Sequence, residues 1–248
     1  MPFAETIIGP CRLIHGDALT VLPEIAGDSY ECVVTDPPYG IGHDAANKLR
    51  HSPGTTKMSA SWHGKSIHGD RDTSVRDAVL AVIDWRQKQG AVFAHWSRPV
   101  VSPEPHGRLI WNKPHLGLPR WGVAFRHSYE DIWLVGKWKF HGIPMGGVLT
   151  PSCVEPNESR GRMHPHEKPI DLLEAIIGRS MAATVMDPFM GSGTTAAACI
   201  RTKRQFIGIE IDKRHFENAC RRVEKEWNRE RSKLPFTASE RPRQLELV

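Results

Sequence analysis

The chain has 248 residues, of which 40% are hydrophobic and 25% are charged. This length suffices for one large α/β domain or two small ones, and the composition is ordinary for a soluble globular protein. Since no segment approaches the roughly 20 continuous apolar residues of a membrane helix and residues 1–6 do not resemble a signal peptide, we expect a cytoplasmic protein without a membrane partner. The net charge of +5 favours a polyanionic partner without requiring one.

Cysteine spacing gives no indication of a disulfide framework. The five cysteines show no CxxC pair, and four of them lie in apolar periodic segments. We therefore expect reduced cysteines that belong mainly to the core.

The stretch that organises the chain is Asp-Pro-Pro-Tyr at residues 36–39. It directly follows an apolar, β-branched run, and we expect a strand over residues 30–36. That strand must stop at the two prolines, because proline has no N–H to give to the ladder. An acid and an aromatic ring are then displayed at the carboxyl end of a strand, which is where ligands bind in an open α/β sheet.

Hydrophobic periodicity predicts the other elements. Strands are expected at residues 11–15, 91–94, 108–111, 130–135, 184–187 and 205–210. Helices are expected from the turn at 16–19 to about residue 25, at 73–89, 170–181 and 196–200, and around Phe216 to Trp227. The segments that connect the three strands within residues 91–135 show few helix signals, which indicates an antiparallel pair at one sheet edge. The basic face of the last helix contacts DNA or is simply solvated.

Two segments lack periodicity. Residues 41–72 are rich in Gly, Ser, His and Lys, and form either a mobile basic flap over the site or a disordered segment. Residues 136–163 interleave basic and aromatic residues, which suits phosphate contact and base stacking, although an ordinary solvated connection fits as well. The candidate DNA-binding residues are Lys48, Arg50, Lys57, Lys65, Lys137, Lys139, Arg160 and Arg162.

A second constellation follows the strand at 184–187. It combines Asp187, a turn with glycines at 191 and 193, and Glu210 at the end of the next strand. Such glycines let the backbone approach a nucleotide closely, and the acid suits a ribose diol. The turn lacks the third glycine of a dinucleotide fingerprint and the Gly-Lys-Ser/Thr of a phosphate loop, which disfavours NAD and ATP.

Four motifs taken together resemble the S-adenosylmethionine-dependent amino-methyltransferases of DNA. They are Gly-Asp-x-Leu at 16–19, Asp-Pro-Pro-Tyr at 36–39, His-Pro-x-x-Lys-Pro at 164–169 and Asp-Pro-Phe-x-Gly-Ser-Gly-Thr-Thr at 187–195. The catalytic motif precedes the cofactor motif, as in the β-group of that family, which includes many N6-adenine enzymes. The resemblance implies a Rossmann-like methyltransferase fold, with a mostly parallel twisted sheet and helices on both faces.

The resemblance also implies roles for the catalytic motif, Asp36, Pro37, Pro38 and Tyr39. Asp36 and the Pro37 carbonyl would accept the two hydrogens of the target amine and aim its lone pair at the sulfonium methyl. Tyr39 would stack on the base. Because a base inside a duplex cannot reach such a pocket, it must be flipped out.

On the cofactor side, the resemblance implies that Phe189 and the two glycines wrap the methionine part, that Glu210 binds the ribose and that Lys168 lies near the carboxylate. Asp17 and Ala18 would meet the adenine ring, although Asp17 fits a helix N-cap equally well. The candidate cofactor residues are Asp17, Ala18, Asp36, Lys168, Asp187, Phe189, Gly191, Ser192, Gly193, Thr194 and Glu210. We expect no metal, because methyl transfer needs none.

The expected organisation is a catalytic domain of residues 1–135 and 164–248 with a small target-recognition insert at 136–163. The expected reaction is methylation of adenine N6 in DNA, because Asp36 resembles the adenine enzymes, whereas many N4-cytosine enzymes carry Ser there. N4-cytosine methylation is the alternative, and a non-catalytic DNA-binding protein that keeps a cofactor pocket is a second one. The family resemblance is also compatible with a homodimer.

Overall fold

The protein is described here by a computed structural model, which covers residues 3–25, 30–41, 69–113, 128–150 and 168–233. Its strands form one nine-stranded sheet in the order β1-β2-β9-β8-β3-β4-β6-β5-β7. The strands are β1 (Ala4–Ile8), β2 (Cys11–His15), β3 (Cys32–Thr35), β4 (Gln89–Ala94), β5 (Pro105–Asn112), β6 (Tyr129–Gly136), β7 (Val148–Leu149), β8 (Thr184–Asp187) and β9 (Gln205–Glu210). The helices are α1 (Ala18–Glu24), α3 (Ser74–Ala81), α4 (Ile170–Arg179), α5 (Thr194–Arg201) and α6 (Lys213–Arg231).

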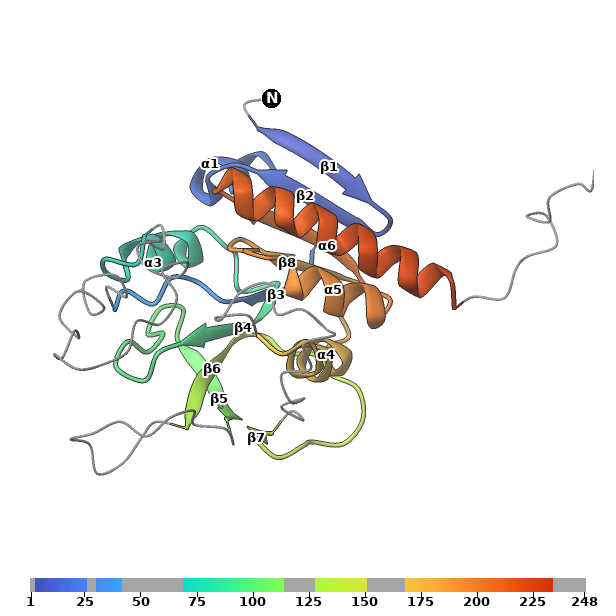
Figure 1. The fold of residues 1–248 in the computed structure, drawn as a ribbon. Helices are drawn as coiled ribbons and strands as arrows, with labels where there is room; N and C mark the ends of the chain where they lie inside the picture. Colours follow the sequence, from blue (N-terminus) through green and yellow to red (C-terminus); the bar gives the residue numbers. More distant parts are fainter. Residues whose placement is uncertain (1–2, 26–29, 42–68, 114–127, 151–167, 234–248) are drawn as a thin grey trace, which may run out of the picture.

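The centre of the sheet is parallel, and antiparallel pairs flank it on both sides. Strands β2, β9, β8, β3 and β4 pair in parallel, whereas β1 runs antiparallel to β2 and β6 runs antiparallel to both β4 and β5 (Figure 1). The predicted mixed α/β sheet with an antiparallel edge is therefore confirmed. From the adjacent strands β8 and β3 the chain continues in opposite directions, to β9 and to β4, and such a reversal opens a crevice at the carboxyl ends of the strands.

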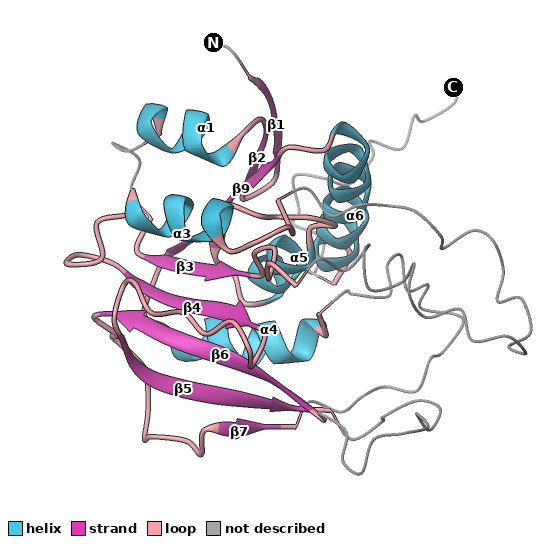
Figure 2. Ribbon diagram, turned by 90° about the vertical axis from the view of Figure 1, so that its left-hand side faces the viewer, coloured by secondary structure: helices cyan, strands magenta, loops and turns pink. Residues whose placement is uncertain are grey.

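Helices cover both faces of the sheet (Figure 2). Apolar residues of α4, α5 and α6 pack with alternate residues of the strands into one core, and α1 and α3 pack against the residues between them. Val33 and Val34 show this alternation on β3: both are fully buried, and they belong to opposite cores. Burial on both faces explains why the central strands read as continuous apolar runs.

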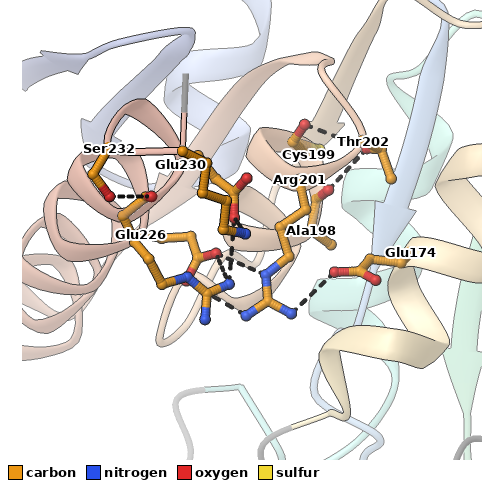
Figure 3. Close-up of polar contacts among 10 residues, drawn as sticks. Glu174, Ala198, Cys199, Arg201, Thr202, Glu226, Glu230 and Ser232 are labelled. Carbon is orange, nitrogen blue, oxygen red and sulfur yellow. Dashed lines mark hydrogen bonds and ion pairs between the residues drawn. The ribbon is translucent and has the colours of Figure 1, made fainter. Parts of the chain in front are cut away.

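An ion-pair network joins the three helices of one face (Figure 3). Arg201 of α5 lies 2.7 Å from Glu226 of α6 and 3.1 Å from Glu174 of α4. Arg229 also pairs with Glu226, at 2.5 Å. The network ties the last residue of α5 to the middle of α4 and to the C-terminal half of α6.

The predicted helix at 73–89 is too long. Helix α3 ends at Ala81, after which Asp84 accepts hydrogen bonds from the Arg86 backbone and side chain and forms a turn. The Trp85 indole donates to the Leu80 carbonyl at 2.8 Å. Gly90 does not close the helix but lies in β4, where an added Cβ would come within 2.6 Å of the Trp85 ring.

Strand β1 was not predicted, because it is a short edge strand with an exposed, weakly patterned sequence. The expectation of reduced cysteines is supported where it can be followed: Cys11, Cys32 and Cys199 are buried, Cys220 is half-buried and all four are free thiols, while Cys153 lies outside the described residues. None of the helices in the described ranges is long and apolar enough to cross a bilayer.

Candidate active site

A cavity of about 520 Å³ lies at the carboxyl ends of the central strands. Its walls include residues 36–39 after β3, residues 187–192 after β8, and Glu210 at the end of β9. The predicted catalytic and cofactor motifs are about 150 residues apart in the chain, and the reversal of strand order brings them to one cavity.

The turn at the catalytic motif depends on Gly40. This residue has φ of +70°, and an added Cβ would lie 2.4 Å from the backbone carbon of Asp72. Its N–H donates to the buried Asp70 carboxylate at 2.7 Å. Gly40 therefore lets the chain leave the strand sharply and keeps Tyr39 at the cavity wall.

Five polar side chains meet beside this turn, and we call them the charge cluster: Asp36, Tyr39, Lys113, Glu130 and Lys168. The Tyr39 hydroxyl donates to Asp36 Oδ1 at 2.7 Å, and Lys168 Nζ lies 2.8 Å from Asp36 Oδ2 and 3.0 Å from the Tyr39 oxygen. Glu130 Oε2 lies 3.1 Å from Lys168 Nζ, and Glu130 Oε1 pairs with Lys113.

The pKa shifts fix the charges of this cluster. Burial raises the pKa of Glu130, but the ammonium groups of Lys168 and Lys113 outweigh it and lower the pKa to about 2. For Lys168, burial lowers the pKa, but Asp36 and Glu130 outweigh it and raise the pKa above its usual value. Burial, followed by the same two carboxylates, raises the pKa of Tyr39 well above 10. At neutral pH, Glu130 is therefore an anion, Lys168 a cation and Tyr39 a neutral phenol.

Asp187 holds the turn after β8 together. Its carboxylate accepts from the hydroxyls of Thr35 and Thr195, both at 2.7 Å, and from the Phe189 N–H at 3.0 Å. Burial raises its pKa to about 6. Three internal donors occupy this carboxylate, so it orders the turn that presents Phe189 to the cavity.

Glu210 faces the cavity from the end of β9. It accepts the N–H groups of Gly191 and Asp212, each at 2.8 Å and each on a different oxygen. Burial raises its pKa. Each oxygen keeps a further lone pair, so the residue can still accept hydrogen bonds from a ligand diol.

The other predicted cofactor residues divide between ligand-facing and structural positions. Ser192 and Thr194 line the cavity. Gly193 does not: it has φ of +79°, and an added Cβ would lie 3.2 Å from Ala219, so it permits close packing of α5 against α6. Asp17 is the N-cap of α1, accepting from Leu19 N at 2.8 Å, and also lines the cavity together with Ala18.

Of the predicted DNA-binding residues, Lys137 and Lys139 lie away from the cavity. They follow Gly136, which pairs with Gln89 at the start of β4, whereas the cavity is at the opposite end of β4. This placement argues against DNA contact by these two lysines at the cavity. Lys48, Arg50, Lys57, Lys65, Arg160 and Arg162, together with residues 164–167 and most of the predicted flap, lie outside the described residues.

Sequence reasoning missed Glu130 and Lys113 as site residues. Glu130 lies at the start of β6, beyond the end of β4, and it pairs with Trp111 of β5. Antiparallel pairing carries this end of β6 to the cavity edge. The sequence signal that could have identified Glu130 is its position as an acidic residue at the start of a mainly apolar strand. In the described part of the chain, no three His, Cys, Asp or Glu side chains are grouped as a metal site would need.

The protein has a Rossmann-like fold of the methyltransferase type, with its cavity at the carboxyl ends of the strands. Residues 120–221 match the N6_N4_Mtase family model, which is described as DNA methylase. The Type II methyltransferase M2.LlaDCHI of Lactococcus lactis subsp. cremoris is 26% identical over 239 residues, which cover 86% of this chain and 89% of the relative. The Type II methyltransferase M2.DpnII of Streptococcus pneumoniae is also 26% identical, over 86% of this chain and 90% of that protein.

A solved structure has the same architecture. The M1.HpyAVI–SAM complex matches with a TM-score of 0.56 and 23% identity, over 86% of this chain and 99% of that one. At this identity the likeness establishes the fold and nothing more. The chain as a whole is thus similar to DNA methylases in sequence and in fold.

Proposed function

We propose that this protein transfers a methyl group from S-adenosylmethionine to the N6 amino group of a flipped-out adenine in DNA. The observation that carries the proposal is that residues 36–39, the turn at 187–192 and Glu210 line the same cavity. The fold, the DNA methylase match and the relatives named as methyltransferases support an S-adenosylmethionine-dependent DNA methyltransferase. The choice of adenine N6 as the methylated atom is the more specific part of the proposal.

The residues present fit the cofactor. The cavity has the volume of a typical small-molecule site, and Glu210 retains acceptor capacity for ribose hydroxyls. Phe189 offers an apolar wall, and Lys168 offers a cation, although its ammonium is held by Asp36 and Glu130. When bound, S-adenosylmethionine supplies an electrophilic methyl group on a sulfonium centre.

The chain's own residues would prepare the amine. An exocyclic amine is a poor nucleophile, because its lone pair is delocalised into the ring. Asp36 and the Pro37 carbonyl accept its two hydrogens, favour a pyramidal nitrogen and match the positive charge that develops on it. Tyr39 stacks on the base, and its hydroxyl bond to Asp36 fixes the ring in advance. Transfer would form the C–N bond as the S–C bond breaks, leaving the demethylated cofactor as a thioether, and the methylated nitrogen would then lose one proton to solvent.

Adenine is favoured over cytosine by the Asp at the first position of the catalytic motif. Methylation of cytosine N4 is the nearest alternative. The cytosine-N4-specific PvuII methyltransferase has a related fold, with a TM-score of 0.58 and 16% identity over 88% of this chain and 92% of that one. That likeness concerns the fold alone, so it does not favour cytosine.

Residues 136–163 remain our proposed target-recognition insert. The described part of this range ends in β7, which pairs with β5 at the edge of the sheet. A homodimer likewise remains a prediction.

The test of this proposal uses labelled cofactor and mixed-sequence duplex DNA, followed by digestion to nucleosides. We expect label in N6-methyl-2′-deoxyadenosine, and label in N4-methyl-2′-deoxycytidine alone would refute the adenine assignment. Asp36→Ala should abolish turnover while cofactor binding, measured by calorimetry, is kept. If cells carrying that variant keep the wild-type biological activity, a non-catalytic DNA-binding role is favoured instead.

A further inference from the structure

Glu130 is an ionised carboxylate in the cavity that the proposed reaction does not use. Its side chain is 16% exposed, and it faces two cations, Lys168 and Lys113. Keeping a carboxylate away from water is costly unless it is paired. Its position beside the Asp36 and Tyr39 pair therefore calls for an explanation.

We propose that Glu130 is a positioning residue for methyl transfer: it holds and neutralises the Lys168 ammonium, so that the Asp36 carboxylate stays available to the target amine. This inference rests on the proposed function and deepens it, because it assigns a task to a residue that does not touch the substrate.

The first step of the argument concerns charge. During transfer, positive charge moves from the sulfonium to the amine nitrogen that Asp36 holds. The Lys168 ammonium lies 2.8 Å from Asp36 Oδ2, and a cation so close opposes that change and competes for the carboxylate. Glu130 lies 3.1 Å from the same ammonium and offsets its charge. With Glu130 removed, Asp36 becomes the one remaining carboxylate paired with Lys168 among the described residues.

The second step concerns geometry. The Tyr39 hydroxyl has one proton, and its oxygen lies 2.7 Å from Asp36 and 3.1 Å from Glu130. The contact with Asp36 is the shorter one, so Glu130 holds the Tyr39 hydroxyl less tightly than Asp36 does. The Lys168 ammonium in turn donates to the Tyr39 oxygen at 3.0 Å. Glu130 therefore acts on the catalytic motif mainly through Lys168.

A pH readout follows from the groups that face Lys168. Asp36, Glu130 and Tyr39 contact its ammonium, while Lys113 lies behind Glu130 and His95 lies beside the Tyr39 ring. Since Glu130 raises the pKa of Lys168, its removal lowers that pKa. In Glu130→Gln, raising the pH then neutralises Lys168 and frees Asp36, so part of the lost rate should return at high pH.

The experiment compares Glu130→Gln with wild type at saturating cofactor and DNA. We expect kcat to fall about 10- to 100-fold, while KM for DNA and the cofactor Kd stay within about threefold. The deficit should shrink as the pH is raised above neutrality. A deficit independent of pH, or an unchanged kcat, would overturn the inference.

Glu226→Gln is the matched control. Its side chain is 11% exposed, and its carboxylate also lies between two cations, Arg201 and Arg229, but it is on α6 and does not line the cavity. We expect a comparable loss of stability with kcat within about twofold of wild type. An equal fall of kcat in both variants would show that Glu130 is merely structural.

A second comparison holds even if Glu130→Gln does not fold. In a Lys168→Met background Glu130 has lost its target, so adding Glu130→Gln should change kcat less than about threefold. A tenfold or larger further loss, measured with cofactor saturating, would refute action through Lys168. If the wild-type protein transfers no methyl group to DNA, the proposed function is wrong and this inference falls with it.

Discussion

Replacement of Glu210 tests the cofactor side of the cavity. The residue is 8% exposed, and each carboxylate oxygen accepts one backbone N–H at 2.8 Å, from Gly191 and Asp212. Glu210→Gln turns one acceptor into a donor that faces an N–H, and leaving that N–H unpaired costs about 1–3 kcal/mol of folding stability. Losing a charge-assisted hydrogen bond to the ribose costs a further 1.5–3 kcal/mol or so of binding free energy, which corresponds to about 10- to 150-fold in Kd.

Isothermal titration calorimetry with S-adenosylmethionine and with its demethylated product measures this effect. Both ligands carry the same ribose, so both should weaken by the same factor. Glu217→Gln on an exposed position of α6 is the control for the chemical change, and it should bind like wild type. If Glu210→Gln binds both ligands within about threefold of wild type, Glu210 does not hold the ribose.

Three further predictions concern stability. Burial raises the pKa of Asp187 to about 6, so its stabilisation is present below about pH 4 and lost as the pH rises through 6. Between these limits, the free energy of unfolding of the cofactor-free wild type, measured with urea, should fall by about 3 kcal/mol more than that of Asp187→Asn. If the free energies of unfolding of the two proteins change with pH in parallel, the prediction is wrong. Gly193→Ala should cost about 1–2 kcal/mol, because φ is +79° and the new Cβ lies 3.2 Å from α6. Gly146→Ala, with open space around it, should cost less than about 0.5 kcal/mol, and equal costs would refute the argument. Arg201→Met should cost about 1–3 kcal/mol by leaving Glu226 with one partner, and an unchanged denaturation midpoint would contradict this.

The fold was predictable where buried strands alternate with amphipathic helices. The run from β8 through α5 to β9 shows this, because strands buried on both faces are continuously apolar and their helices begin at marked turns. Strand β1 escaped prediction, since an exposed edge strand needs no apolar pattern. The end of α3 at Ala81 was missed because apolar spacing continues through Ile83, while the Asp84 turn breaks the helix.

The site was predictable only as far as motifs and strand ends define it. Asp36 directly follows β3 and Glu210 ends β9, and the carboxyl ends of parallel strands meet at one edge. Glu130 opens an antiparallel strand instead, and its contact with Tyr39 spans 91 residues of sequence. Such a contact depends on pairing order in the sheet, which local sequence does not encode. For the same reason the partners of Lys168 emerged only from the structure.

Sequencing of modified bases in DNA from cells that express this protein tests the central claim most directly, because it reports the base and its sequence context together. We predict N6-methyladenine at a recurrent sequence context in cells with the wild-type chain and none in cells with Asp36→Ala. N4-methylcytosine in its place, or the same pattern of modification with both chains, would contradict the account.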